Sequence, residues 1–459
     1  MAAGLVFVSS GAVLVLEILG IRLLAPYVGL TLETTTTIIG TVLAGIAAGA
    51  AVGGRAADRL DERRLLAVLL ASGGVLAMLT VPLVRGLGDA LRGGGDAAAF
   101  MVTLVALFPP AAALSAVTPT VARMQLRDLG ETGSVVGRLS AWATAGGLVG
   151  TFATGFVIVP LVPTDIAVIA VGGVLVALGV AAGAAPAYVA GALALAALTL
   201  AAGAPCDAET DYHCARVVED PGRPAGRTLV LEDLPHSYVD LADPRYLEFD
   251  YTRWIGAAID DLDGGQLDAL FLGGGGFTLP RFLAATRPGS RSRVLEVDGD
   301  LVELARERLG LRTGPALAVR VGDARVTLRD EAAASADLIV GDAFGNRAVP
   351  WHLTTAEFVA EVRRVLRPGG LYALNVIDYD PFGLVRAEAA TLLEAFDELA
   401  LVTQPDPGGN FVFLASDGAL PAVEGARVLD RAEVERLADG ADPLRDDDAP
   451  ADQLLTPRA

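Results

Sequence analysis

Three acidic residues stand at or just after the ends of short apolar runs: Glu296, Asp323 and Asp342. A carboxylate at the end of a strand can accept hydrogen bonds from ribose hydroxyls, and a carboxylate beside an amine can take up its proton. Glu296 lies 20 residues after the last glycine of a four-glycine run, which is the spacing of a ribose-binding acid. Together with the glycine run, these residues indicate a nucleoside site.

The elements that must position these acids follow a strand, turn and helix pattern. Residues 269–272 predict a buried strand that ends in four glycines, and a helix begins near Thr278 with Pro280 in its first turn. Such a unit opens a doubly wound parallel sheet, whose strand ends share one edge. Further strands are predicted at 293–296, 317–321, 337–340 and 371–376, with helices at 300–309 and 354–366.

The sequence from about residue 206 to 380 resembles the spermidine synthase family and, more widely, the S-adenosylmethionine-dependent methyltransferase fold. The segments that carry the resemblance are the glycine turn with Glu296, and the motifs at Glu209–His213, Leu229–His236 and Glu248–Tyr251. The resemblance implies an α/β doubly wound, Rossmann-like domain with a small β-hairpin region before it. The segments Leu16–Ile18 and Arg22–Pro26 resemble the membrane part of bacterial proteins that join such a domain to an all-α transmembrane bundle.

The resemblance also implies residue roles and a reaction. Asp342 matches the family's proton acceptor, Glu296 would hold the ribose, and Asp323 with Ala324 would meet the adenine. The reaction would be aminopropyl transfer from decarboxylated S-adenosylmethionine to putrescine or a related amine, without a metal or a covalent intermediate. The further predicted cofactor contacts are Gly273, Gly274, Gly275 and His213, and the predicted substrate contacts are Tyr212, His236, Tyr251 and Pro350.

The chain departs from the family pattern in the half of the site that would bind the diamine. Gly276 and Gly345 stand where the family has aspartates, and Ala257 aligns with a histidine that contacts the polyamine. A dication in a pocket needs paired charges, so the acceptor half is altered. The alternatives are transfer of a methyl group from S-adenosylmethionine to another, membrane-associated acceptor, a transporter with a nucleoside-sensing domain, or a non-catalytic scaffold.

Charge and apolar residues are divided unevenly along the 459 residues. Apolar residues dominate residues 1–205, which carry ten arginines and ten acidic residues, so the whole net charge of −20 belongs to the rest. An acidic surface repels nucleic acid, which excludes that class of partner, and it suits a small cationic substrate or simply solubility. We expect a multi-pass domain in the cell membrane at 1–205, a catalytic domain at 206–425 and an acidic tail at 426–459, with a helix near 431–438.

Seven segments are long and apolar enough to be candidate membrane spans. We expect Pro109–Pro110 to break the fourth, and the last two to be separate helices, since a single helix would reduce the count to six. Glycines every four residues at Gly45, Gly49 and Gly53 favour close helix packing within the bundle over a homodimer contact. The candidate spans are 3–24, 34–53, 65–84, 97–121, 139–161, 165–183 and 187–204.

The side of the membrane on which the second half lies stays open from the sequence. The loop at 54–64 and the loop holding Arg123, Arg127 and Arg138 are rich in arginine and should be cytoplasmic. Seven spans then place the second half outside, and six place it inside. Cys206 and Cys214 are either a disulfide, which requires an oxidising compartment, or two free thiols. Glu17 and Arg22 lie within or near the end of the first span, five residues apart.

Overall fold

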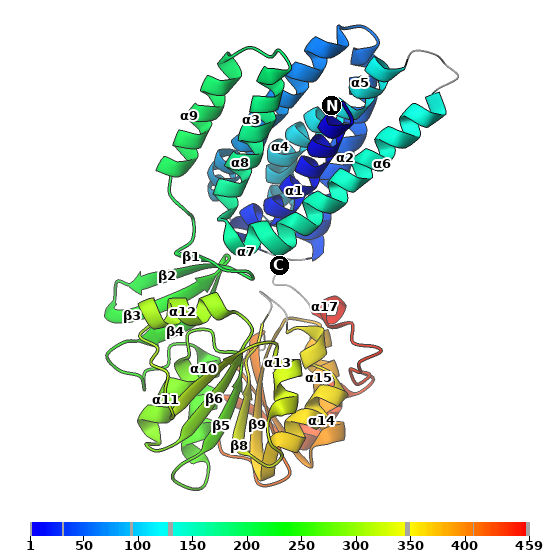
Figure 1. Cartoon of the computed structure of the whole chain (residues 1–459). Helices are drawn as coiled ribbons and strands as arrows, with labels where there is room; N and C mark the ends of the chain where they lie inside the picture. Colours follow the sequence, from blue (N-terminus) through cyan, green and yellow to red (C-terminus); the bar gives the residue numbers. More distant parts are fainter. Residues whose placement is uncertain are drawn as a thin grey trace. The chain divides into compact units, whose positions relative to one another are not determined.

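The computed structural model describes residues 2–29, 32–91, 95–126, 132–344, 349–406 and 408–455. The chain divides into a first unit, Met1–Cys214, and a second unit, Ala215–Ala459 (Figure 1). The first unit is helical up to residue 201, and the second is built on a β-sheet with helices on it. The predicted fold class, an all-α apolar bundle followed by a doubly wound α/β domain, is therefore confirmed.

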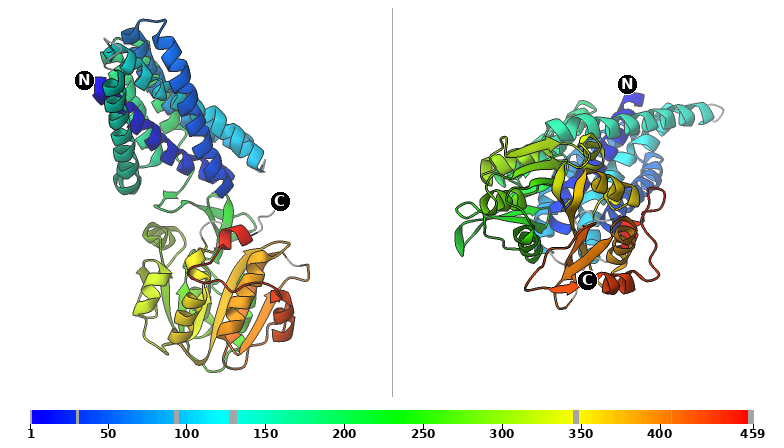
Figure 2. Two further views of the ribbon diagram at one scale, coloured as in Figure 1. Left: turned by 90° about the vertical axis from the view of Figure 1, so that its right-hand side faces the viewer. Right: turned by 90° about the horizontal axis from the view of Figure 1, so that it is seen from below.

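The helices of the first unit lie side by side (Figures 1 and 2). Within the described ranges, six helical segments are long and apolar enough to cross a membrane, and α9 is apolar but shorter. The two last predicted spans are separate helices, α8 and α9, so the break predicted between them is confirmed. The elements are α1 (Ala2–Val28), α2 (Leu32–Ala57), α3 (Glu62–Ala90), α4 (Gly95–Ser115), α5 (Val117–Gln125), α6 (Thr132–Ala153), the π-helix η2 (Thr154–Ile158), α7 (Val159–Leu161), α8 (Thr164–Ala181) and α9 (Ala187–Ala201).

The break predicted at Pro109–Pro110 is wrong. Helix α4 runs through both prolines, and the chain turns only at Ala116, before α5. Proline removes the hydrogen bond to the carbonyl four residues earlier, which for Pro110 is the carbonyl of Ala106. The Thr80 hydroxyl donates to that carbonyl oxygen at 3.0 Å. A neighbouring helix thus satisfies the freed group, as apolar surroundings require.

The glycine stripe of α2 packs against α4, as predicted. A Cβ on Gly49 would lie 2.1 Å from the backbone oxygen of Ala112, and one on Gly53 would lie 2.5 Å from the Ala116 Cβ. The two helix backbones therefore approach each other too closely for any larger residue. This contact lies within the bundle, which is the arrangement that the glycine spacing favoured over a homodimer contact.

A small antiparallel sheet leads from the first unit to the main sheet. Its strand order is β1-β2-β3-β4, and β3 and β4 form the predicted hairpin, which turns at Glu232 and Asp233. Residues 230–231 and 238–240 are buried, so the hairpin holds a fixed register. The strands are β1 (Ala208–Glu209), β2 (Cys214–Asp220), β3 (Arg223–Leu231) and β4 (Leu234–Asp240).

The main sheet of the second unit has eight strands in the order β12-β10-β11-β9-β8-β5-β6-β7. The five strands from β5 to β9 are parallel and match the five predicted strands, whereas β10, β11 and β12 are antiparallel and were not predicted. From β5 the chain continues to β6 and β7 on one side, and it then returns to β8 on the other side of β5. The topological switch point, at which the strand order reverses, therefore lies between β5 and β8. The strands are β5 (Asp268–Leu272), β6 (Arg291–Glu296), β7 (Leu317–Val321), β8 (Ala336–Gly341), β9 (Leu366–Asp378), β10 (Glu398–Thr403), β11 (Gly409–Ser416) and β12 (Arg427–Leu429).

Helices cover this sheet and complete its core. Helix α10 packs beside α11, and α14 packs beside α15, which also holds α16. The predicted helix near 431–438 is α16, and its Val434 is fully buried in the core, so this part of the acidic tail is docked. The helices are α10 (Asp250–Asp261), α11 (Thr278–Thr286), α12 (Gly299–Arg308), α13 (Ala324–Thr327), α14 (Ala356–Val365), α15 (Gly383–Ala395), α16 (Arg431–Ala438) and α17 (Ala451–Leu454), with short 3₁₀ turns η3 (Leu328–Asp330) and η4 (Trp351–Leu353).

Candidate active site

The carboxyl ends of four parallel strands bring the predicted nucleoside residues to one edge of the sheet. The glycine turn follows β5, Glu296 ends β6, Asp323 follows β7 and Asp342 follows β8. The Gly273 amide bonds the Leu295 carbonyl at 2.8 Å, which fixes the turn beside the end of β6. Residues up to 70 positions apart in sequence therefore share the edge at which open α/β sheets bind ligands.

Two glycines of the turn have no room for a side chain. Gly273 has a φ of 96°, and a Cβ there would lie 2.4 Å from the backbone oxygen of Asp342. A Cβ on Gly276 would lie 2.7 Å from the Cβ of Ser237 on β4, and the Gly276 amide donates to the Ser237 hydroxyl at 3.0 Å. An aspartate at position 276 would therefore require Ser237 on β4 to move.

Glu296 ties the glycine turn to the end of β6. Its Oε2 accepts from the amide of Gly274 at 2.7 Å and from that of Gly275 at 3.3 Å, and its Oε1 accepts from the Asp298 amide at 2.9 Å. The side chain is buried, with 7% of its surface exposed. The carboxylate is therefore held in one orientation beside the glycine turn.

Asp323 is the N-cap of α13 and also contacts a histidine. Its Oδ1 accepts from the Val326 amide at 3.3 Å, and its Oδ2 lies 3.0 Å from Nε2 of His352. Ala324, the other predicted adenine contact, is buried at the start of α13. Both residues follow β7, which lies next to β6 on the side away from β5, so they lie farther from β5 than Glu296 does.

Asp342 is held by two donors from different elements. Its Oδ1 accepts from the Asn375 side-chain amide at 2.8 Å, and its Oδ2 accepts from the Tyr251 hydroxyl at 3.1 Å. Asn375 in turn accepts from the Asn410 amide at 3.0 Å. Strands β9 and β11 and helix α10 thus converge on one carboxylate, which leaves its remaining lone pairs for a proton from the pocket.

The surroundings of Asp342 set its proton affinity near neutrality. Burial raises the pKa of Asp342 to about 6, against the opposing effect of the hydrogen bonds from Asn375 and Tyr251, which lower it. Burial, followed by the nearby Asp342 carboxylate, raises the pKa of Tyr251 well above its usual value, so Tyr251 stays a donor. A carboxyl with a pKa near 6 is a stronger base than an ordinary aspartate and is still ionised at neutral pH.

A cavity of about 380 Å³ opens over Asp342. This volume suits a small molecule rather than a macromolecule. Its wall combines apolar side chains with amides and a few charges. The lining residues are Leu234, Pro235, His236, Ser237, Glu248, Phe249, Asp250, Tyr251, Arg253, Gly274, Gly275, Asp342, Phe344, Asn375, Ile377, Gln404 and Asn410.

The carboxylates that line the cavity besides Asp342 are already engaged. Asp250 pairs with Arg253 and accepts from the Gln404 amide at 2.7 Å, and Glu248 accepts from the Tyr246 hydroxyl. These side chains are largely exposed, so their ion pair is weak and can be exchanged for a ligand contact. The cavity therefore presents the Asp342 carboxylate together with the paired charges of Asp250 and Arg253 and the carboxylate of Glu248.

Some of the residues predicted to contact the substrate line the cavity, and others do not. Tyr251 and His236 line the cavity as expected of substrate contacts, whereas Pro350 precedes η4 and is not among the lining residues. Tyr212 and His213 belong to the first unit, and their predicted contacts at the site remain untested predictions. Gly345, the second position at which an aspartate is missing, lies outside the described residues.

Three amide-bearing residues of the cavity were missed from the sequence: Asn375, Gln404 and Asn410. Asn375 could have been recognised from the sequence, because it is the polar residue in the mostly apolar run 371–376, which is predicted to be a buried strand. A buried amide needs hydrogen-bond partners, and a strand that points to the site edge can supply them there. Asn410 and Gln404 come from the antiparallel strand region, for which no strand was predicted.

Within the described residues, no group of three or more His, Cys, Asp or Glu side chains is arranged to hold a metal ion. The described groups of the site can supply acid–base and hydrogen-bonding chemistry. These are a positioned base at Asp342, a hydroxyl donor at Tyr251, and backbone amides and a carboxylate at the glycine turn.

No family model matches the chain. A segment of 154 residues is 30% identical to the polyamine aminopropyltransferase of Vibrio vulnificus (strain CMCP6), covering 33% of this chain and 51% of that protein. This chain thus spans about half the length of the curated relative that it matches.

The chain also matches solved structures. A probable spermidine synthase from Corynebacterium glutamicum ATCC 13032 is 29% identical, with a TM-score of 0.48 over 52% of this chain and 95% of that one. Spermidine synthase from Thermotoga maritima is 17% identical, with a TM-score of 0.38 over 54% and 82% of the two chains. The sequence match to the curated protein carries the conclusion that the C-terminal part of this chain is similar to spermidine synthases, the polyamine aminopropyltransferases.

Proposed function

We propose that the second unit transfers an aminopropyl group from decarboxylated S-adenosylmethionine to putrescine or a related amine. The observation that carries this proposal is the position of Asp342, whose pKa is raised to about 6 and which lines a small-molecule cavity together with Gly274 and Gly275 of the glycine turn. The similarity to a polyamine aminopropyltransferase supports the same reaction.

The reaction needs alignment and one proton acceptor. The amine nitrogen attacks the aminopropyl carbon next to the sulfonium, the carbon–sulfur bond breaks, and methylthioadenosine leaves as a neutral thioether. The nitrogen loses one proton, which Asp342 accepts while Tyr251 and Asn375 hold the carboxylate in place. Glu296 and the amides of the glycine turn would hold the nucleoside, with Asp323 and Ala324 at its base.

A second candidate is methyl transfer from S-adenosylmethionine to a different acceptor. It is favoured by the packing of Ser237 on Gly276, which leaves no space for a side chain at position 276.

A product assay on the purified full-length protein tests both candidates. The protein is incubated with decarboxylated S-adenosylmethionine and putrescine, and in parallel with S-adenosylmethionine and a membrane extract, and the products are identified by mass spectrometry. Spermidine with methylthioadenosine supports the first candidate. S-Adenosylhomocysteine without spermidine supports the second, and the absence of both sets of products contradicts an enzymatic role for the site.

A further inference from the structure

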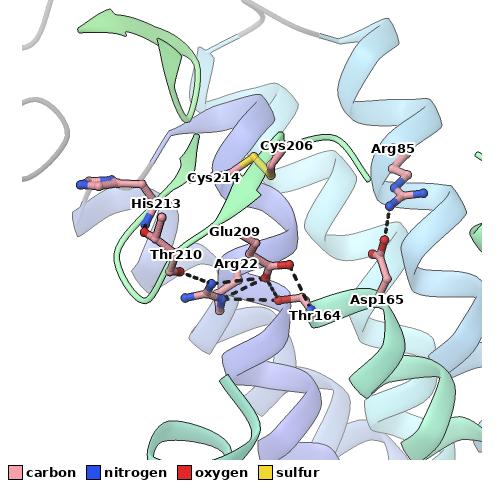
Figure 3. Close-up of a disulfide and its surroundings, with 9 residues drawn as sticks. All are labelled: Arg22, Arg85, Thr164, Asp165, Cys206, Glu209, Thr210, His213 and Cys214. Atoms are coloured by element: carbon pink, nitrogen blue, oxygen red, sulfur yellow. Dashed lines mark hydrogen bonds and ion pairs between the residues drawn. A yellow bond between two sulfur atoms is a disulfide. The ribbon is translucent and has the colours of Figure 1, made fainter. Parts of the chain in front are cut away.

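The helix bundle of the first unit has two ends, and polar contacts between helix termini identify which termini lie together at each end. At one end, Arg123 at the end of α5 lies 3.5 Å from Asp58, which follows α2. At the other end, Arg22 of α1 donates to the Thr164 hydroxyl at the start of α8 at 3.4 Å (Figure 3). We call these the basic end and the disulfide end, after the residues described next.

The basic end exposes six arginines and few acids. Among the described residues, three acids accompany them: Asp58 pairs with Arg123, Asp61 caps α3 through the Arg64 amide, and Glu62 begins α3. The excess charge at this end is therefore positive. Its exposed arginines are Arg55, Arg59, Arg63, Arg64, Arg123 and Arg138.

At the disulfide end the two described arginines are internal to the protein. The Arg22 guanidinium lies 3.3 Å from Glu209 and donates to the carbonyl of Thr210 at 2.6 Å (Figure 3). It also donates to the carbonyl of Asp211 at 3.1 Å. Arg22 is thus turned toward protein acceptors, with 18% of its side chain exposed. It pairs with Glu209 and not with Glu17, its neighbour on the same helix.

The second arginine of this end, Arg85, is paired with Asp165 at the start of α8 (Figure 3). Because both arginines are neutralised, the exposed charges of this end that the structure describes are acidic. They are Glu33, Asp89, Asp207 and Asp211. The two ends of the bundle therefore carry opposite charge at their surfaces.

A disulfide closes the loop that Arg22 holds. Cys206 and Cys214 are bonded, so of the two alternatives left by the sequence the structure has the disulfide (Figure 3). The closed loop contains Glu209, whose Oε2 also accepts from the Thr164 amide at 3.1 Å. The disulfide therefore belongs to the end of the bundle that has no free arginine among its described residues.

The number of passages between the ends follows from α9. Near its start, Tyr188 packs with the cluster of Ala67 and Ala71 at the beginning of α3. Near its end, the Thr199 carbonyl accepts from Arg85 at 3.2 Å. Helix α9, with 15 residues, thus runs beside α3 from near the beginning of α3 towards Arg85. The chain passes seven times from one end to the other, in α1, α2, α3, α4 with α5, α6, α8 and α9.

We propose that the basic end lies against the cytoplasmic leaflet of the membrane and that the disulfide end lies on the outer, oxidising side. Exposed arginines are retained on the cytoplasmic side and are attracted to anionic lipid head groups there. Disulfides persist in oxidising compartments and are rare in the cytosol. Charge and redox chemistry are independent of each other, and they give the same orientation.

This orientation also fixes the side of the second unit. Ala215 follows Cys214 directly, and all candidate spans of the described chain lie in the first unit. The candidate active site is therefore on the outer side, where a nucleoside made in the cytosol would have to be exported before use. The orientation does not depend on the proposed function, and the two are tested separately.

The test uses two single-cysteine additions in the full-length protein, expressed in its membrane. Leu60→Cys places a thiol at the exposed basic end, and Ala419→Cys places one on an exposed loop of the second unit. A membrane-impermeant maleimide is applied to intact cells and to permeabilised cells. We expect Ala419→Cys to be labelled in intact cells and Leu60→Cys only after permeabilisation. The reverse pattern, or protection of both thiols in intact cells, would overturn the orientation.

A second measurement uses the natural cysteines and needs no substitution. Membranes are denatured with a polyethylene glycol maleimide present, with or without prior reduction, and the protein is followed by gel shift. We expect a shift of two labels only after reduction. Labelling of both thiols without reduction would contradict an oxidising location. The wild-type protein is also the background control for the two cysteine additions, because its own thiols are blocked.

Discussion

Asn375 donates from its side-chain amide to Oδ1 of Asp342, 2.8 Å away, while accepting from Asn410. The bond favours the ionised carboxylate and so lowers the pKa of Asp342, against the larger effect of burial. Asn375 is thus a positioning residue that lowers the pH at which the proposed base, Asp342, becomes ionised. It lies towards the carboxyl end of β9, where it pairs with Val412 of β11.

The rate of the proposed transfer should rise as the pH increases through about 6, because Asp342 must be ionised to accept a proton. Asn375→Leu removes a hydrogen bond to the ionised form, so this acidic limb should move to higher pH. Asn410→Ala removes only the partner of Asn375 and should move it less. The measurement is the pH profile of kcat/KM for the three proteins. An unchanged limb in Asn375→Leu would separate this residue from the base.

Asp342→Asn should lower kcat by about 10²- to 10⁴-fold, the usual contribution of a positioned base. The substitution keeps the size of the side chain, so binding of methylthioadenosine, measured by calorimetric titration, should be nearly unchanged. Full activity in this variant would show that another group takes the proton.

The same substitution should stabilise the protein at alkaline pH. The folded-state pKa of Asp342 is raised to about 6, so the folded protein binds the proton more tightly than the unfolded chain does. Stability is then lost as the pH rises from the unfolded value near 4 through 6, by up to about 3 kcal/mol. Asp342→Asn removes this loss. Chemical denaturation at pH 8 should favour the variant, and at pH 4 the difference should vanish.

Glu296→Gln should weaken nucleoside binding by about 10- to 100-fold, because a charged acceptor for ribose hydroxyls and for the turn amides is lost. The rate at saturating nucleoside should fall much less. Glu307→Gln, an exposed change on α12, is the matched control and should leave the affinity unchanged. Equal affinities in the two variants would exclude Glu296 from the nucleoside site.

Gly276→Asp should destabilise the second unit by about 1–3 kcal/mol, because the added Cβ would meet the Cβ of Ser237. Ser237→Gly removes that Cβ and should recover part of the loss in the double variant. A double-mutant cycle by chemical denaturation measures the coupling. If the two substitutions are additive, the contact with Ser237 is not what excludes an aspartate. A double variant that also gains putrescine affinity would link this contact to acceptor choice.

Local sequence was sufficient for the strands, turns and acids of the nucleoside edge. Strand ends, glycines and helix caps are short-range features, so Glu296 and Asp342 could be placed at one edge from the alternating pattern alone. The same is true of the apolar spans and of the arginine-rich loops. The four-residue glycine spacing likewise predicted that this face of α2 packs closely on a neighbouring helix, which the structure shows to be α4.

Tertiary structure decided what depends on distant partners. Asn375 and Asn410 lie on strands of one sheet but 35 residues apart, and only the antiparallel pairing of β9 and β11 brings them to Asp342. Helix α4 continues through Pro110 because Thr80 of another helix satisfies the freed carbonyl. Arg22 meets Glu209 across 187 residues rather than Glu17 on its own helix. Hydrogen bonds and ion pairs need particular atoms at particular distances, and the sequence specifies those atoms but only the folded chain sets their distances.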